Sequence, residues 1–139
     1  MPDKDGKMHK LSSLRGKVVI LQFWSATEQA SRDNNRQLAS LYAKYKSRGL
    51  EIYSVSLDTS KLVWEEAMTF DKVTWTSVCD LQGVSSQAAM LYNIRPMQDA
   101  NGNVIIQVPQ LFILDKEGNL IGKNLFGKRL DDRMAEIFR

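Results

Sequence analysis

The sequence predicts an α/β sandwich with a mixed β-sheet. Residues 17–24 form a nearly continuous apolar run rich in β-branched side chains, which is typical of a strand buried on both faces. Residues 28–48 change to helical spacing, and residues 50–57 alternate apolar and polar side chains as a second strand does. Because short turns join these elements, they predict a right-handed unit with a parallel strand pair. Residues 108–126 predict an antiparallel hairpin, so the sheet is expected to be mixed.

The first helix and the middle of the chain follow from apolar spacing. In the first helix the buried stripe is expected at Leu38, Leu41, Tyr42 and Tyr45. Residues 58–60 form a helix-capping cluster, and the helix after them has a short apolar stripe of Trp64, Ala67 and Met68. A brief extended segment at residues 74–78 precedes a further helix, whose predicted stripe is Val84, Ala88, Leu91 and Tyr92.

The last third of the chain predicts two hairpins and a helix. Residues 96–103 have the composition of a loop, with a hairpin turn at residues 99–102 between short extended arms. The antiparallel hairpin turns at residues 116–118. The final helix is expected to open with Asp131 and Asp132, which are favourable beside its N-terminal dipole, and to bury Leu130, Met134 and Ile137.

Length and charge limit the classes of function. With 139 residues the chain fits one domain, residues 1–139. Its net charge is +3, but the 19 basic and 16 acidic residues are scattered, which argues against nucleic-acid binding. The longest uncharged apolar stretch, residues 18–26, is far shorter than the roughly 20 residues that a membrane span needs. We expect no nucleic-acid partner and no membrane contact by the domain itself.

Cysteine and histidine are too few for several kinds of site. Cys79 is the only cysteine, so no disulfide can close within the chain, and thiolate metal sites are excluded. His9 is the only histidine, which leaves no Cys/His ligand set and no Ser-His-Asp triad with a choice of bases. We expect no metal and no cofactor, and we expect His9 to be exposed near the N-terminus.

Five segments together resemble one family. They are Asp5–Lys7, Leu11–Val19, Phe23–Trp24, Leu91–Arg95 and Val108–Gly118. In this order and spacing they resemble the thioredoxin-fold proteins of the TlpA/ResA-like and AhpC/TSA group, over almost the whole chain. The resemblance implies a thioredoxin-like three-layer α/β/α sandwich with a central mixed β-sheet, a cis-proline loop and a helical insertion. It also implies a location in the bacterial periplasm or cell envelope. It further implies that the domain is excised from a longer precursor, without the precursor's signal or lipid anchor.

The chain departs from this family at the redox motif. Redox-active relatives carry Trp-Cys-x-x-Cys where the first strand meets the first helix. The corresponding positions hold Thr27 for the tryptophan, Glu28 and Ser31 for the two cysteines, and Gln29 and Ala30 between them. Disulfide exchange needs a thiolate nucleophile and a second sulfur to resolve the mixed disulfide. The resemblance therefore implies a vestigial active site without dithiol chemistry.

Glu28 has two interpretations. An anion at a helix N-terminus gains about 0.3–1 kcal/mol, and Ser25 with Glu28 three residues later has the pattern of a capping box. Alternatively, Glu28 is a general base for hydrolysis, which requires a pocket and a second polar group that the sequence does not identify. The first interpretation is favoured.

Pro109 matches the proline that is cis in this fold and faces the active-site helix. In relatives the residue before it, here Val108, offers backbone groups that hold an extended substrate. The resemblance thus implies a surface for an extended peptide or protein partner, with Trp24, Thr27, Val108 and Pro109 as its binding residues. Residues 96–107 are an insertion just before this surface; they form either a flap over the former active site or a surface hairpin.

Cys79 separates the two functions that remain. It follows a short extended segment and does not open a helix, so a buried core thiol is favoured over a nucleophile. The leading prediction is a redox-inactive binding or accessory module. The alternative is a thiol-disulfide oxidoreductase or peroxidase-like antioxidant protein that works through Cys79 alone.

Overall fold

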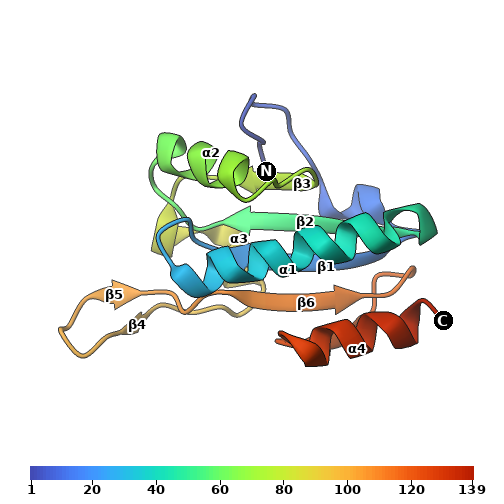
Figure 1. Ribbon diagram of the computed structural model, residues 1–139. Helices are drawn as coiled ribbons and strands as arrows, with labels where there is room; N and C mark the ends of the chain where they lie inside the picture. Colours follow the sequence, from blue (N-terminus) through green and yellow to red (C-terminus); the bar gives the residue numbers. More distant parts are fainter.

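A five-stranded mixed sheet forms the centre of the computed structural model, which describes residues 1–139 (Figure 1). The strand order is β3-β2-β1-β6-β7. β1 is parallel to β2, and β2 to β3, whereas β6 is antiparallel to both β1 and β7. The strands are β1 (Val18–Trp24), β2 (Leu50–Ser56), β3 (Thr76–Cys79), β6 (Gln110–Leu114) and β7 (Leu120–Lys123). The predicted mixed sheet, with its parallel unit and its antiparallel hairpin, is confirmed.

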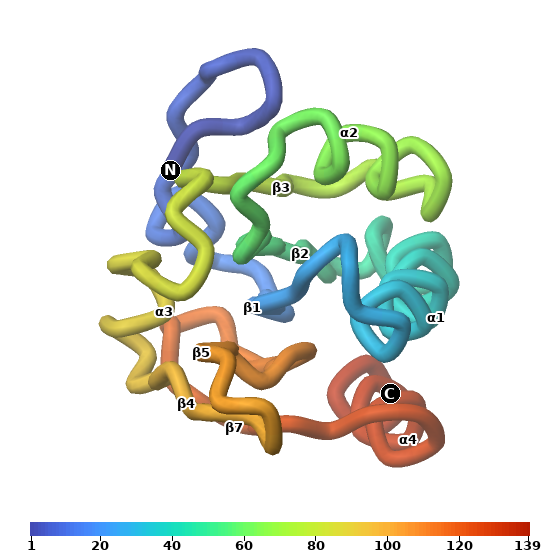
Figure 2. Tube along the Cα trace, turned by 90° about the vertical axis from the view of Figure 1, so that its left-hand side faces the viewer, coloured from blue at the N-terminus to red at the C-terminus, as the bar shows by residue number.

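Helices lie on both faces of this sheet. α1 (Gln29–Tyr45), α2 (Lys61–Phe70) and α4 (Lys128–Ile137) lie on one side, and the short α3 (Gln87–Leu91) lies on the other (Figure 2). The second face also carries a 3-10 helix at Leu11–Leu14. None of the helices combines the length and the apolar composition that crossing a bilayer requires.

β1 is the strand around which both cores form. All seven of its residues are buried, as expected for a strand covered on both faces. Ile20 points to the cluster that contains Leu38 of α1 and Leu130 of α4. Leu21 points the other way, to a cluster that contains Ala89 of α3.

The insertion after β3 differs from its predicted helix. A 3-10 turn at Gly83–Ser85 comes first, and Ser86 then has an extended conformation before α3 begins. This break rotates the apolar stripe, so Leu91 is 84% exposed and Val84 is exposed, while Ala89 is buried. The predicted stripe is therefore wrong at Val84 and Leu91.

The last helix begins earlier than predicted. α4 opens at Lys128 with Gly127 as its N-cap, so Asp131 lies inside the first turn rather than at the start. Leu130 and Met134 are buried as expected, and Ile137 is half-buried. The predicted turn at residues 99–102 is confirmed, since it joins β4 (Met97–Gln98) to β5 (Val104–Ile105).

Candidate functional site

The candidate site lies where β1 ends and α1 begins. α1 starts at Gln29, and Glu28 is its N-cap residue with an exposed side chain that forms no capping hydrogen bond. The hydroxyl of Ser25 is directed to Asp58 and not to α1. The predicted capping box between Ser25 and Glu28 is therefore wrong, although Glu28 does stand at the positive end of the helix dipole.

Ser31 closes the turn that leads into α1. Its side chain is fully buried, and its Oγ accepts the N–H of Ser25 at 3.2 Å. Gln29 and Ala30, between Glu28 and Ser31, are exposed, and the Gln29 amide donates to Asp33 at 2.9 Å. Of the four residues from Glu28 to Ser31, Ser31 alone is part of the interior.

Asp58 is the buried carboxylate beneath this turn. It accepts the Ser25 hydroxyl at 2.9 Å, the N–H of Ala26 at 3.0 Å, and the hydroxyl of Ser56. The capping cluster predicted at residues 58–60 is confirmed at Ser60, whose Oγ accepts from the N–H of Val63 and caps α2, whereas Asp58 does not cap the helix. The signal that could have found Asp58 is its place just after β2, because the carboxyl ends of adjacent parallel strands lie together.

A partly buried ion pair fixes the first turns of α1 against the end of α2. Arg32 donates to Asp71 through Nε at 2.6 Å and Nη2 at 2.9 Å, and the Asp71 side chain is fully buried. These hydrogen bonds raise the pKa of the Arg32 guanidinium. Asn35 also donates to Asp71 and accepts from Gln22 of β1, which extends the network into the sheet.

Pro109 lies beside the start of α1. The Val108–Pro109 peptide bond is cis. Pro109 shares a groove of about 630 Å³ with Ala30 and Asn34 of α1 and with Gly127 before α4. The backbone N–H and C=O of Val108 have no hydrogen-bond partner in the protein. An extended chain could therefore pair with Val108 as strands pair with a free edge.

The expected binding residues do not all meet. Pro109 lines the groove and Val108 precedes it in the chain, but Thr27 lines a separate hollow with Ser25 and Asp58. Trp24 is fully buried in the cluster that contains Trp64. We therefore correct Trp24 to a core residue, because a ligand cannot contact a side chain without accessible surface.

The insertion does not cover the site. The β4–β5 hairpin projects beyond the end of the sheet (Figure 1), and its strand residues are all exposed. No residue from 96 to 107 lines the groove of Pro109. Of the two interpretations, the surface hairpin agrees with the structure and the flap is wrong.

Cys79 lies at the end of β3, in the cluster that also holds Trp24 and Ala26 just before α1. Its side chain is 3% exposed and packs with Trp64 and Met68 of α2. Its Sγ lies 3.5 Å from the carbonyl oxygen of Asp58 and accepts the N–H of Leu81 at 3.3 Å. Burial raises the pKa of the Cys79 thiol, which disfavours the thiolate that reacts.

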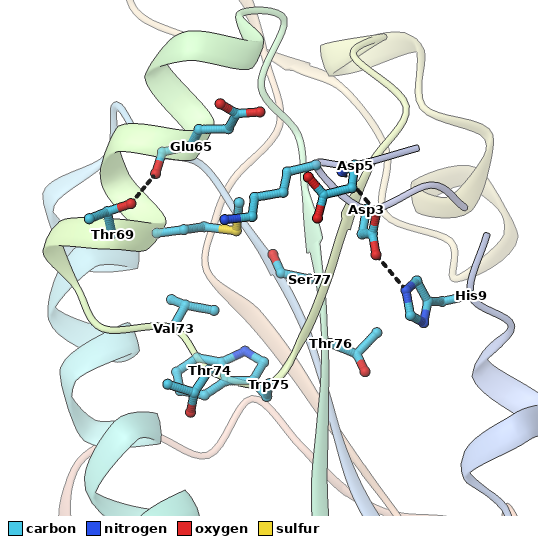
Figure 3. Close-up of a pocket in the computed structure, with 12 residues that line it drawn as sticks. Asp3, Asp5, His9, Glu65, Thr69, Val73, Thr74, Trp75, Thr76 and Ser77 are labelled. Atoms are coloured by element: carbon cyan, nitrogen blue, oxygen red, sulfur yellow. Dashed lines mark hydrogen bonds and ion pairs between the residues drawn. The ribbon is translucent and has the colours of Figure 1, made fainter. Parts of the chain in front are cut away.

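A second pocket lies along β3, at the edge of the sheet away from Pro109. It is formed by the N-terminal segment, α2 and β3 (Figure 3), and none of the expected site residues lines it. His9, for which the sequence suggested no partner, is here 2.8 Å from Asp3, and this contact lowers the pKa of Asp3. No cluster of three His, Cys, Asp or Glu side chains is placed to hold a metal ion.

Comparison with known proteins agrees with this geometry. The model of the AhpC/TSA family matches residues 1–122. The chain belongs to the AhpC/TSA family. Within this thioredoxin-like family it is 30% identical over 120 residues to the thiol-disulfide oxidoreductase ResA of Geobacillus kaustophilus, covering 86% of the chain and 61% of that relative. The chain spans about 60% of the length of the curated ResA relatives it matches.

Solved structures of thiol-disulfide oxidoreductases share the fold. The thioredoxin domain of one from Bacteroides vulgatus superposes with a TM-score of 0.84 at 25% identity, covering 99% of this chain and 91% of that one. The C-terminal domain of a putative one from Bacteroides thetaiotaomicron gives a TM-score of 0.83 at 27% identity, covering 99% and 88%. The thioredoxin-like α/β/α fold expected from the resemblance is confirmed.

Proposed function

We propose that this domain is a redox-inactive thioredoxin-like module that binds an extended polypeptide beside Pro109. One observation carries the proposal: Glu28 and Ser31 stand at the start of α1, and the only thiol, Cys79, is buried at the end of β3. A carboxylate and a hydroxyl cannot be oxidised to a bridge, so the scaffold has no sulfur pair to exchange. The family resemblance supports a place in the bacterial envelope.

The groove beside Pro109 supports the binding part of the proposal. Val108 offers an unpaired backbone N–H and C=O, and Ala30 and Asn34 form the wall opposite Pro109. Both polar atoms of the Asn34 amide are buried without a partner in the protein. A peptide backbone has the donor and the acceptor that these groups lack.

The alternative is an oxidoreductase that works through Cys79. The names of the ResA relatives favour it, since they describe thiol-disulfide oxidoreductases. The buried position of Cys79 and the raised pKa of its thiol oppose it.

An insulin-reduction assay separates the two functions. We expect the parent chain and Cys79→Ser to show no turnover, and Glu28→Cys/Ser31→Cys to gain it, because paired thiols at a helix N-terminus are activated. Circular dichroism confirms that each variant folds. Turnover by the parent that disappears in Cys79→Ser would establish the alternative and overturn the proposal.

Binding is tested with a carboxymethylated, permanently unfolded polypeptide as the probe. Ala30→Arg fills the groove beside Pro109, whereas Ala43→Arg adds the same side chain to an exposed position further along α1. We expect Ala30→Arg to weaken binding at least tenfold and Ala43→Arg to leave it unchanged. Equal affinities for all three chains, or no binding by the parent, would refute the peptide surface.

A further inference from the structure

The second face of the sheet is only partly covered. Three helices lie on one side, whereas the five residues of α3 and the four of the 3-10 helix Leu11–Leu14 lie on the other (Figure 2). A groove of about 710 Å³ remains there, and 8 of its 15 lining residues are hydrophobic. Its volume lies in the range of sites that hold small organic molecules.

The strand register gives this groove an apolar floor. Val19 of β1 pairs with Leu114 of β6, and Leu114 pairs with Leu120 of β7, so the three side chains share one face of the sheet. Leu120 is 57% exposed, and Leu91 at the end of α3 is 84% exposed. An apolar surface left open in a concave groove is typical of a binding site.

Three cations line the same groove. Arg15 and Lys17, in the segment just before β1, both line it. Lys123 lies on the floor, with its Nζ 5.8 Å from the ring centroid of Phe112. None of the three belongs to an ion pair of the protein.

One carboxylate, Asp115, lines the groove with them. Its Oδ1 accepts the N–H of Glu117 at 3.0 Å and of Asn119 at 2.8 Å, so it is engaged in its own turn. Three cations against one carboxylate leave the lining with an excess of two positive charges. The free charges are thus complementary to an anion.

We propose that this groove binds an anionic amphiphile, a single long-chain carboxylate. Its alkyl chain lies over the floor between Leu91 and Leu120, and its carboxylate is held by Arg15 and Lys17. A neutral chain would leave the cations unpaired, and a cationic one would be repelled. The groove is at the amino end of β1, whereas Pro109 lies at the carboxyl end, so this site does not depend on the proposed peptide surface.

Isothermal titration calorimetry with dodecanoate below its micelle-forming concentration tests the proposal. We expect saturable binding at least tenfold tighter than that of dodecanol or dodecyltrimethylammonium. We expect two variants at exposed positions each to weaken dodecanoate binding at least tenfold: Arg15→Gln/Lys17→Gln and Leu91→Ser. The control Arg36→Gln/Lys44→Gln removes two exposed charges from α1 on the other side of the sheet and is expected to change nothing.

Three results would overturn the proposal. The first is that dodecanoate binds no more tightly than dodecanol. The second is that Arg36→Gln/Lys44→Gln weakens dodecanoate binding as much as Arg15→Gln/Lys17→Gln does. Alternatively, anionic phosphatidylglycerol vesicles bind the protein through Arg15 and Lys17 while dodecanoate monomers do not, which would make the groove a membrane contact.

Discussion

The carboxylate of Asp58 is the side chain on which the turn into α1 depends most. It receives hydrogen bonds from Ser25, Ala26 and Ser56 and so joins the ends of two parallel strands. A buried polar group that is left without its hydrogen-bond partner lowers the free energy of unfolding by about 1–3 kcal/mol. The turn between β1 and α1 is thus held by a specific polar centre.

Asp58→Asn is expected to lower the free energy of unfolding by about 1–3 kcal/mol, because the amide turns a donor toward groups that already donate. Urea denaturation followed by circular dichroism measures the change. Asp132→Asn is the matched control: its carboxylate pairs with Lys128 at the surface and is expected to contribute less than about 1 kcal/mol. Equal losses for both variants would contradict the role of Asp58.

Tyr42 makes stability sensitive to alkaline pH. Burial, with the nearby charge of Glu51 and the hydrogen bond to it, raises the pKa of Tyr42 to about 12. The tyrosine of the unfolded chain has a pKa of about 10. The stability that Tyr42 contributes is therefore fully present below pH 10 and is lost as the pH rises through about 12.

Tyr42→Phe is therefore expected to reduce the loss of unfolding free energy between pH 10 and about 12. Burial also raises the pKa of Tyr53 and Tyr92, so part of the pH dependence is expected to remain. Tyr45→Phe is the comparison variant, because the hydroxyl of Tyr45 forms no hydrogen bond. An unchanged pH profile in Tyr42→Phe would contradict the assignment.

Among the elements, the β4–β5 hairpin is the one that contributes least to the fold. Its strands pair only with each other, and Met97 and Val104 are exposed. Replacing Met97–Ile105 by two glycines is expected to change the free energy of unfolding by less than about 1 kcal/mol. Thermal and urea unfolding measure it.

Ile94→Ala shows that the same assay resolves a real loss, because Ile94 is buried and its truncation is expected to cost about 2–5 kcal/mol. A cost of that size for the hairpin deletion would mean that the hairpin packs against the domain.

Elements whose sequence pattern arises directly from burial could be predicted from the sequence. β1 is buried along its whole length, as its apolar run indicates, and Gly49 ends the first helical segment with a φ of 103°. The stripe of α3 could not be predicted, because the extended Ser86 interrupts the periodicity. Local spacing carries no information on such a break.

At the scale of the whole molecule, the candidate site depends on residues far apart in the sequence. Ala26 and Asp58 are separated by 32 residues, and Arg32 and Asp71 by 39. The positions of Glu28, Ser31 and Pro109 could be predicted because motif spacing defines them. The contacts of Asp58 and Asp71 could not, since those of Asp58 need β1 and β2 to pair and those of Asp71 need α1 to pack beside α2.

The fold separates its surfaces along β1. The groove of Pro109 lies at the carboxyl end and the cationic groove at the amino end, while the only thiol is enclosed under α2. This separation is what the proposed binding role requires of a thioredoxin-like scaffold.

Alkylation of Cys79 by iodoacetamide, followed by intact-protein mass spectrometry, tests directly whether any reactive sulfur remains. We expect the native chain at pH 8 to be labelled at least a hundredfold more slowly than the same chain in denaturing urea, because burial shields the thiol and raises its pKa. Labelling of the native chain at pH 6 as fast as that of the unfolded chain would show an activated thiolate, and would contradict the account.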